Sequence, residues 1–161
     1  MSFKAILSVF PLKFYLIWDQ EGNLLKLNLA WDFNLVSQVI FYDNEKAQKF
    51  CKAFWEALWS YWNFKTPFIN VKHRLIGTEL EKKVLLGLRE IKIGKVKRYK
   101  DLAEEVGISK GYRWIGKILA KNPLPLVYPC HRVIGSKNLG GYSQGFLIKQ
   151  FLLYRELEII R

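Results

Sequence analysis

The chain has 161 residues, of which 50% are hydrophobic and 16% aromatic, so we expect one or two folded domains and exclude a disordered chain. No apolar run is long enough to span a bilayer, and the short apolar start is interrupted by Pro11 and Lys13, so we expect neither a membrane protein nor a signal peptide. The formal net charge is +12, and nine of these charges lie in residues 71–132, which hold 15 basic and 6 acidic residues. Such a segment favours a polyanionic partner, with nucleic acid as the default and a solvated lysine-rich surface as the alternative.

The first strand pattern lies in residues 14–18, which are mostly apolar. Residues 25–31 alternate apolar and polar side chains, which is typical of a half-buried strand. Between them, residues 19–23 contain Gly and Asn, which favour a turn. These three segments predict an antiparallel hairpin.

A long helix is predicted for residues 43–61, with Asp43 as its cap. Cys51 lies on the apolar stripe of this helix, so we interpret it as a core residue. With only Cys51 and Cys130 as cysteines, and His73 and His131 as histidines, the chain lacks a disulfide framework and has few zinc ligands. We therefore expect no metal, and lone thiols favour an intracellular protein.

The basic segment begins with a capping box, Thr78 to Glu81, and the helix that follows is predicted to end at Gly94. A short helix over residues 100–106 and a second over residues 110–121, capped by Ser109, predict a helix-turn-helix. The second helix carries a basic face, as a DNA-reading helix does. Its members are Lys110, Arg113, Lys117 and Lys121.

The most informative stretch is Pro129-Cys130-His131-Arg132. Proline stiffens the backbone, and a neighbouring positive charge or histidine lowers the pKa of a thiol and favours the nucleophilic thiolate. We interpret Cys130 as a reactive thiol, with a buried structural cysteine beside an unrelated histidine as the alternative.

A glycine-rich loop, residues 135–145, follows the cysteine motif and allows close approach of a ligand to the backbone. Its glycine spacing is not that of a phosphate-binding loop. The last helix is predicted over residues 146–160. Glu156 lies in its later half, where the residues alone indicate a surface position.

Together these features resemble the O6-alkylguanine-DNA alkyltransferases, also called methylated-DNA–protein-cysteine methyltransferases. The resemblance extends over about residues 77–156 and depends on the Pro-Cys-His-Arg-Val-Ile tract, the upstream Asn122-Pro123, the basic helix-turn-helix and the Gly-Tyr-Ser loop. It implies an α/β protein with a variable N-terminal α/β domain, residues 1–70, made of a small antiparallel sheet plus helix and ribonuclease-H-like. A mostly helical C-terminal domain, residues 71–161, would hold the helix-turn-helix and the active site.

The activity that the resemblance implies is DNA repair by direct reversal. The alkyl group of O6-alkylguanine in double-stranded DNA, with O4-alkylthymine as a further candidate, moves irreversibly to Cys130, so that each molecule acts once. The resemblance implies no cofactor, and we expect a cytoplasmic monomer. The family's base, its orienting carboxylate, its hinge asparagine and its tyrosine donor correspond to His131, Glu156, Asn122 and Tyr99.

The resemblance also assigns DNA contacts. Arg113 matches the arginine finger that enters the base stack when the damaged base is flipped out. In the family the recognition helix enters the minor groove. DNA contacts then fall on Tyr112, Lys110, Gly116, Lys117 and Lys121, and the base pocket on Val133, Tyr142, Ser143, Gly145 and Pro125.

Two other classes stay open at this point. A non-catalytic lesion-binding helix-turn-helix protein would not need Cys130. A cysteine hydrolase would not need a basic helix-turn-helix, and adjacent residues such as Cys130 and His131 seldom form a direct catalytic pair. The sequence departs from the family at Trp114, where a small residue is usual, and at Leu157, where glycine is usual.

Overall fold

The computed structural model describes residues 2–33, 38–108 and 111–157. The chain divides into two compact units, Met1–Leu75 and Ile76–Arg161, each with its own buried apolar side chains. In the ranges that the structure describes, no helix combines the length and the apolarity needed to cross a membrane.

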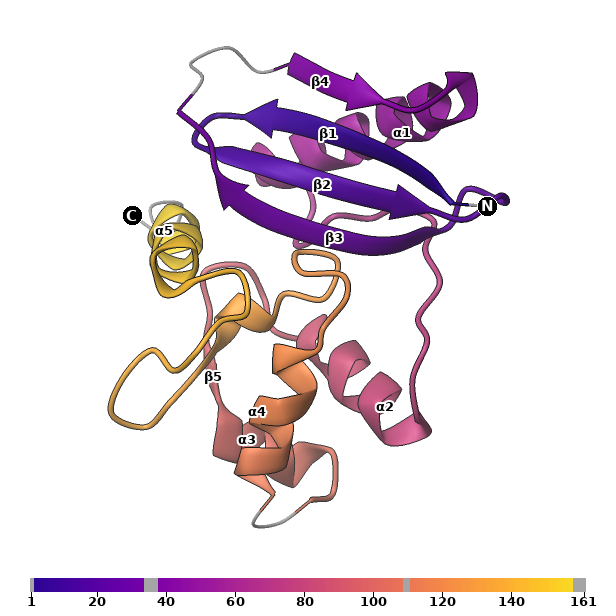
Figure 1. Ribbon diagram of the computed structural model, residues 1–161. Helices are drawn as coiled ribbons and strands as arrows, with labels where there is room; N and C mark the ends of the chain where they lie inside the picture. The colour runs from indigo at the N-terminus through magenta and orange to yellow at the C-terminus, as the bar shows by residue number, and fades with distance from the viewer. Residues whose placement is uncertain (1, 34–37, 109–110, 158–161) are drawn as a thin grey trace. The chain divides into compact units, whose positions relative to one another are not determined.

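The first unit is an antiparallel sheet with one helix against it (Figure 1). Its strands lie in the spatial order β3-β2-β1-β4. The predicted hairpin is confirmed, because β2 and β3 pair from Leu12 opposite Trp31 to Trp18 opposite Leu24. The bounds are β1 Phe3–Val9, β2 Leu12–Trp18, β3 Leu24–Trp31, β4 Gln38–Tyr42 and α1 Glu45–Trp62.

Strands β1 and β4 do not emerge from the sequence pattern. In β1 the consecutive residues Leu7, Ser8 and Val9 are all buried, so the alternation that identifies a half-buried strand is lost. The predicted helix cap is wrong by one residue, since Asn44 Oδ1 accepts the bond from Ala47 N at 3.0 Å. Asp43 instead accepts a bond from Lys4 N in the neighbouring strand. Cys51 is buried on α1, as predicted.

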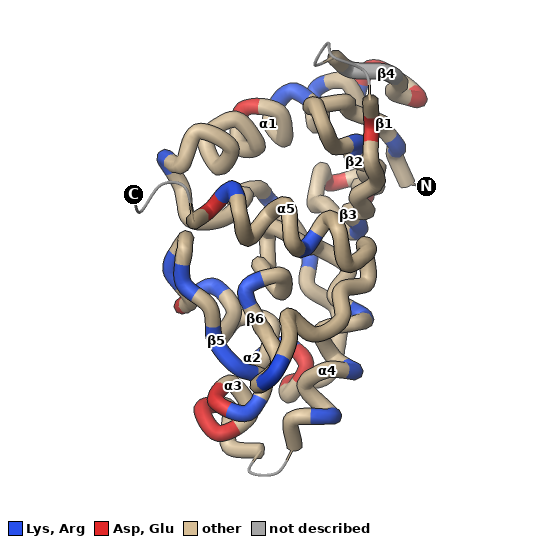
Figure 2. The backbone as a smooth tube through the Cα atoms, turned by 90° about the vertical axis from the view of Figure 1, so that its left-hand side faces the viewer, with Lys and Arg blue, Asp and Glu red and all other residues tan. Residues whose placement is uncertain are grey.

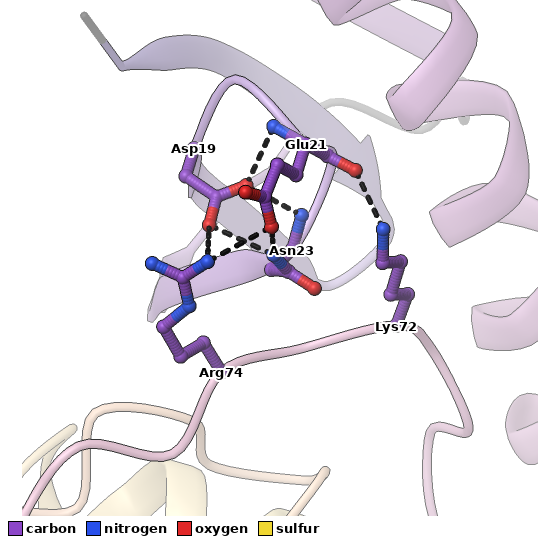
Figure 3. Close-up of polar contacts among 5 residues, drawn as sticks. All are labelled: Asp19, Glu21, Asn23, Lys72 and Arg74. Atoms are coloured by element: carbon purple, nitrogen blue, oxygen red, sulfur yellow. Dashed lines mark hydrogen bonds and ion pairs between the residues drawn. The ribbon is translucent and has the colours of Figure 1, made fainter.

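A network of polar contacts ties the end of this unit to the β2–β3 turn (Figure 3). Arg74 Nη2 lies 3.2 Å from Asp19 Oδ2 and 2.9 Å from Glu21 Oε2, while Lys72 Nζ donates to Glu21 O at 2.8 Å. Asn23 completes the turn by donating to the Asp19 carboxylate. These contacts explain why the first compact unit extends to Leu75.

The second unit is mostly helical, as predicted (Figure 1). The capping box of α2 is present, with Glu81 N bonded to Thr78 Oγ1 and Thr78 N bonded to Glu81 Oε2. The predicted end at Gly94 is wrong, because α2 ends at Leu88 and the chain tightens into turns, although Ile91 remains buried. The bounds are α2 Glu79–Leu88, β5 Lys97–Arg98, α3 Tyr99–Glu105, α4 Tyr112–Ala120, the 3-10 turn η1 Cys130–Arg132, β6 Val133–Ile134 and α5 Phe146–Leu157.

The helix-turn-helix consists of α3 and α4, and it begins its second helix later than predicted. Gly111 is the N-cap of α4, while Ser109 and Lys110 lie outside the described residues. A Cβ at Gly111 would lie 2.1 Å from Ile108 Cγ2, so this turn requires glycine. Figure 2 shows basic residues along α4 and acidic residues on α3.

Candidate active site

The cysteine motif is held in a buried turn. The backbone before it is unusual, since the fully buried Leu126 adopts φ +70°, a conformation that non-glycine residues seldom take outside functional regions. The turn η1 then presents Cys130, and β6 pairs in parallel with β5 immediately afterwards. The motif is thus fixed on both sides by packing and backbone pairing.

Asn122 links α4 to the reactive sulfur. Its Nδ2 donates to Cys130 Sγ at 3.1 Å and to Tyr128 O at 2.9 Å, and its Oδ1 accepts from Leu124 N at 3.0 Å. All three bonds are buried, so the amide orientation is well determined. The structure therefore brings Asn122 and Cys130 together.

Burial determines the resting state of the thiol. It raises the pKa of Cys130 to about 11, while the Asn122 bond and the charge of Lys149 act weakly in the opposite direction. The expectation that neighbouring groups lower this pKa is wrong for the resting fold, because the loss of hydration outweighs them. The protein stores a thiol, and deprotonation must be coupled to the reaction.

His131, Glu156 and Arg132 form a buried triad beside the thiol. His131 Nε2 lies 2.8 Å from Glu156 Oε1, and Arg132 donates to both carboxylate oxygens at 2.9 Å. Arg132 Nη1 also donates to Ile91 O at 2.8 Å. Burial alone would raise the pKa of Glu156, but His131 and Arg132 hold it well below its ordinary value.

The triad fixes the tautomer of His131. A carboxylate only accepts hydrogen bonds, so Nε2 carries the proton and Nδ1 offers a lone pair. Nδ1 is buried and has no hydrogen-bond partner among the residues that the structure describes. Burial also lowers the pKa of His131, against the opposing effect of Glu156. The ring is therefore neutral at pH 7 and can accept a proton at Nδ1.

Lys149 of α5 is a buried cation that the sequence analysis missed. Its Nζ donates to Val133 O at 2.6 Å and to Gly141 O at 3.1 Å, and it lies 5.8 Å from the centre of the Tyr99 ring. Burial lowers its pKa to about 8, while the thiol acts in the opposite direction. Lys149 and Glu156 are seven residues apart and lie on the same buried stripe of α5. This spacing was the sequence signal that could have identified Lys149 as a buried residue.

Tyr99 and the glycine loop form one wall of the site. The Tyr99 hydroxyl donates to Gly141 O at 3.4 Å, and burial raises its pKa, so the phenol stays protonated. A Cβ at Gly140, where φ is +71°, would lie 2.8 Å from the Tyr99 ring. Glycine is thus required where the loop crosses the ring.

A cavity of about 490 Å³ lies over Cys130, within the range of small-molecule sites. Of the predicted residues, Val133 and Pro125 are buried outside the lining that the structure describes, and Gly145, with φ +105°, is exposed and also lies outside this lining. The cavity is lined by Tyr99, Tyr112, Gly116, Leu119, Ala120, Cys130, Gly141, Tyr142 and Ser143.

The other predicted DNA contacts lie on the exposed side of α4. The side chains of Arg113, Lys117 and Lys121 are exposed, and the Arg113 guanidinium lies 5.9 Å from the centre of the Tyr112 ring. Lys110 lies outside the described residues. One short helix therefore carries both cavity residues and a basic outer surface.

The comparisons with known proteins agree with this geometry. The family described as "6-O-methylguanine DNA methyltransferase, DNA binding domain" matches residues 79–158. The methylated-DNA–protein-cysteine methyltransferase of Methanosarcina mazei is 34% identical over 147 residues, which cover 84% of this chain and 93% of the relative. The chain belongs to the methylated-DNA–protein-cysteine methyltransferase family.

Two further comparisons differ in how much of each chain they cover. The Metallosphaera sedula methylated-DNA–protein-cysteine methyltransferase is 41% identical over 97 residues, 60% of this chain and 61% of the relative. The crystal structure of Mycobacterium tuberculosis OGT in complex with DNA is 25% identical, with a TM-score of 0.73 over 91% of this chain and 87% of that chain. The first match is thus partial, while the structural match extends over both units.

Proposed function

We propose that this methyltransferase repairs DNA by moving the alkyl group of O6-alkylguanine to Cys130. The sulfur attacks the alkyl carbon, the bond from that carbon to O6 breaks, and its electron pair stays on the guanine. A thioether forms and no group in the site removes it, so each molecule reacts once. The observation that carries the proposal is a buried thiol at the base of a 490 Å³ cavity.

His131 is the proposed base. Its unprotonated Nδ1 takes the thiol proton through a bridging water, and Glu156 stabilises the imidazolium that results. Arg132 keeps Glu156 ionised, so the carboxylate is ready for this role. Because the pKa of Cys130 is about 11, the resting group is a thiol, and the proposal couples its deprotonation by His131 to attack on the alkyl carbon.

Tyr99 is the proposed acid. Its hydroxyl lines the cavity and stays protonated, so it can donate to a guanine ring nitrogen as negative charge develops there. This proton makes guanine a better leaving group. Lys149 is a positioning residue in the proposal, since it ties the Val133 and Gly141 carbonyls together beside the reacting sulfur.

Double-stranded DNA is the partner, and α4 is the proposed element that opens it. O6 of a paired guanine lies inside the duplex, so the nucleotide must be flipped out to reach a buried thiol. Arg113 is exposed at the start of α4 and takes the place of the base, while Lys117 and Lys121 contact phosphates.

The test is transfer of methyl from O6-methylguanine DNA to the protein, located by peptide mass spectrometry. We expect one methyl on Cys130 of the wild-type protein and none on Cys130→Ala. Cys51→Ala is the matched control, because Cys51 is buried in the first unit, and it should react like the wild-type protein. A methyl on any other residue, or none at all, would refute the proposal.

The division into domains at residues 70 and 71 and the cytoplasmic location stay predictions. Limited proteolysis tests the first of them, with cleavage expected in the connecting segment around Leu75.

A further inference from the structure

Helix α4 presents a second surface beside the cavity, of which the proposed function uses only Lys117 and Lys121, as phosphate contacts. Trp114, Lys117, Ile118 and Lys121 fall at spacings of three, one and three residues, and therefore lie along one side of the helix. Together with Glu81 of α2 they line a hollow of about 170 Å³, separate from the cavity over Cys130. We refer to these five residues as the Trp114 hollow.

Trp114 is the unusual member of this hollow. Its side chain is 53% exposed, although an indole offers one of the largest apolar surfaces of any residue. Tryptophan is enriched where a surface binds a partner, since one flat ring supplies a large contact area. The exposed ring thus indicates a ligand with a flat face.

The charges around Trp114 indicate what that ligand carries. Lys117 and Lys121 are exposed, and neither lies within ion-pair distance of a carboxylate among the described residues, although the charge of Lys121 helps to lower the pKa of Glu81. Glu81 Oε2 accepts bonds from Thr78 N at 2.8 Å and Thr78 Oγ1 at 3.0 Å, so this carboxylate is engaged at the start of α2. Two ammonium groups beside an exposed indole fit an aromatic base with its phosphates.

We propose that the Trp114 hollow is a second DNA-contact point, where the indole stacks on an unpaired nucleobase and Lys117 and Lys121 neutralise the neighbouring phosphates. The inference rests on the proposed function, because flipping the damaged nucleotide leaves its partner base without a pair. In an intact duplex both faces of each base are stacked and pairing holds the base in place, whereas a base that has lost its pair unstacks more easily. The indole therefore favours DNA that has been opened.

The test uses lesion-free oligonucleotides, so that binding is measured without methyl transfer. Dissociation constants are determined by fluorescence anisotropy for a fully paired duplex and for the same duplex with one unpaired base. The variants are Trp114→Ala and Trp114→Phe. Tyr154→Ala is the matched control, since Tyr154 is an exposed aromatic residue of α5 outside both hollows. Melting curves establish that each variant is folded.

We expect Trp114→Ala to bind the duplex with the unpaired base about tenfold more weakly than the wild-type protein, a change of about 1.4 kcal/mol. The loss on the paired duplex should be smaller, Trp114→Phe should keep most of the affinity, and Tyr154→Ala should keep all of it. Equal losses on both duplexes, or no loss on either, would overturn the inference. A hollow that binds a protein partner would give the second result.

Failure of the proposed function can be recognised separately. If the wild-type protein shows the expected preference for the unpaired base but transfers no methyl to Cys130, the repair proposal fails and the stacking site stands. If it transfers methyl while Trp114→Ala binds both duplexes like the wild-type protein, only the stacking site fails.

Discussion

At the scale of single residues, burial raises the pKa of both acids of the site, but their hydrogen-bond partners differ in how far they oppose it. Glu156 receives hydrogen bonds from His131 and Arg132, and these outweigh its loss of hydration, so its pKa falls. Cys130 receives one bond from Asn122, which is too little, so its pKa rises to about 11. At neutral pH Glu156 is therefore ionised, whereas Cys130 is a protonated thiol.

Glu156→Gln tests the carboxylate. Since the pKa of Glu156 is lowered on folding, it contributes stability that is fully present above its ordinary value of 4.5 and is lost progressively as pH falls from there toward the much lower folded pKa. The variant leaves Arg132 buried without its charge partner, so we expect a loss of about 3 kcal/mol in urea unfolding at neutral pH. The difference in unfolding free energy between the wild-type protein and the variant should have begun to decrease at a pH of about 4. Glu90→Gln, at an exposed site, is the control, and a difference that does not change with pH would contradict the account.

Lys149→Met tests the buried cation. The pKa of His131 lies below its ordinary 6.5, so wild-type repair should reach a plateau above that pH and fall in acid as Nδ1 is protonated. Above pH 8 Lys149 loses its charge, so the rate of the wild-type protein should fall again on the alkaline side. In single-turnover assays the variant should be about tenfold slower at neutral pH, and its rate should rise steadily as Cys130 ionises unaided. An unchanged alkaline limb would show that Lys149 does not act on the reaction.

At the scale of elements, the sequence predicts those parts that depend on local chemistry. The Thr78–Glu81 capping box and the β2–β3 hairpin are confirmed because their signals lie within a few residues. Strand β1 was missed because its consecutive buried residues interrupt the alternation, and β4 was missed because Gln38–Tyr42 holds four hydrophobic residues in a row instead of alternating. The end of α2 was misplaced, because Ile91 continues the apolar spacing beyond the last helical turn.

The site follows the same rule. Cys130 and His131 belong to one specific motif and Asn122 lies shortly before it. The structure brings these three residues together. Lys149 is a long-range partner that lies on a helix with many apolar residues, and only its spacing of seven residues from Glu156 separates it from a surface lysine. The raised pKa of the thiol also depends on packing that no motif encodes.

Arg113→Ala tests α4 as the element that opens DNA. The variant should slow repair of O6-methylguanine in duplex DNA by about tenfold or more, because nothing holds the stack open. Its reaction with the free base O6-benzylguanine should lose much less, since a free base needs no flipping. Lys117→Gln serves as the comparison. It should mainly weaken the salt dependence of DNA affinity, by about one unit in the slope of log affinity against log salt concentration. Equal losses of Arg113→Ala on both substrates would exclude the finger role.

At the scale of the whole molecule, the net charge of +12 gives a general attraction to DNA, while the fold gives the chemistry. Basic residues on α4 share the second unit with the buried thiol, so affinity and reaction reside in one compact unit. The same tight packing implies that the product differs in stability from the starting protein.

Alkylation should therefore destabilise the fold. A new group on Sγ lies beside Asn122 Nδ2, which is 3.1 Å from the sulfur, and overpacking against this amide and the buried turn costs about 1–3 kcal/mol. We expect the melting temperature to fall by about 2–8 °C after reaction with O6-methylguanine DNA. Protein incubated with undamaged DNA is the control. Equal melting temperatures for the two samples would mean that the alkyl group lies outside the packed region.

The most direct test of the account is the stoichiometry of transfer. Protein is mixed with a large excess of O6-methylguanine DNA carrying a labelled methyl, and the label on protein and the repaired guanine are counted together until the reaction stops. The account predicts one methyl per protein molecule, all on Cys130, and an equal amount of repaired guanine. Continued repair beyond that point, or repair without label on Cys130, would contradict it.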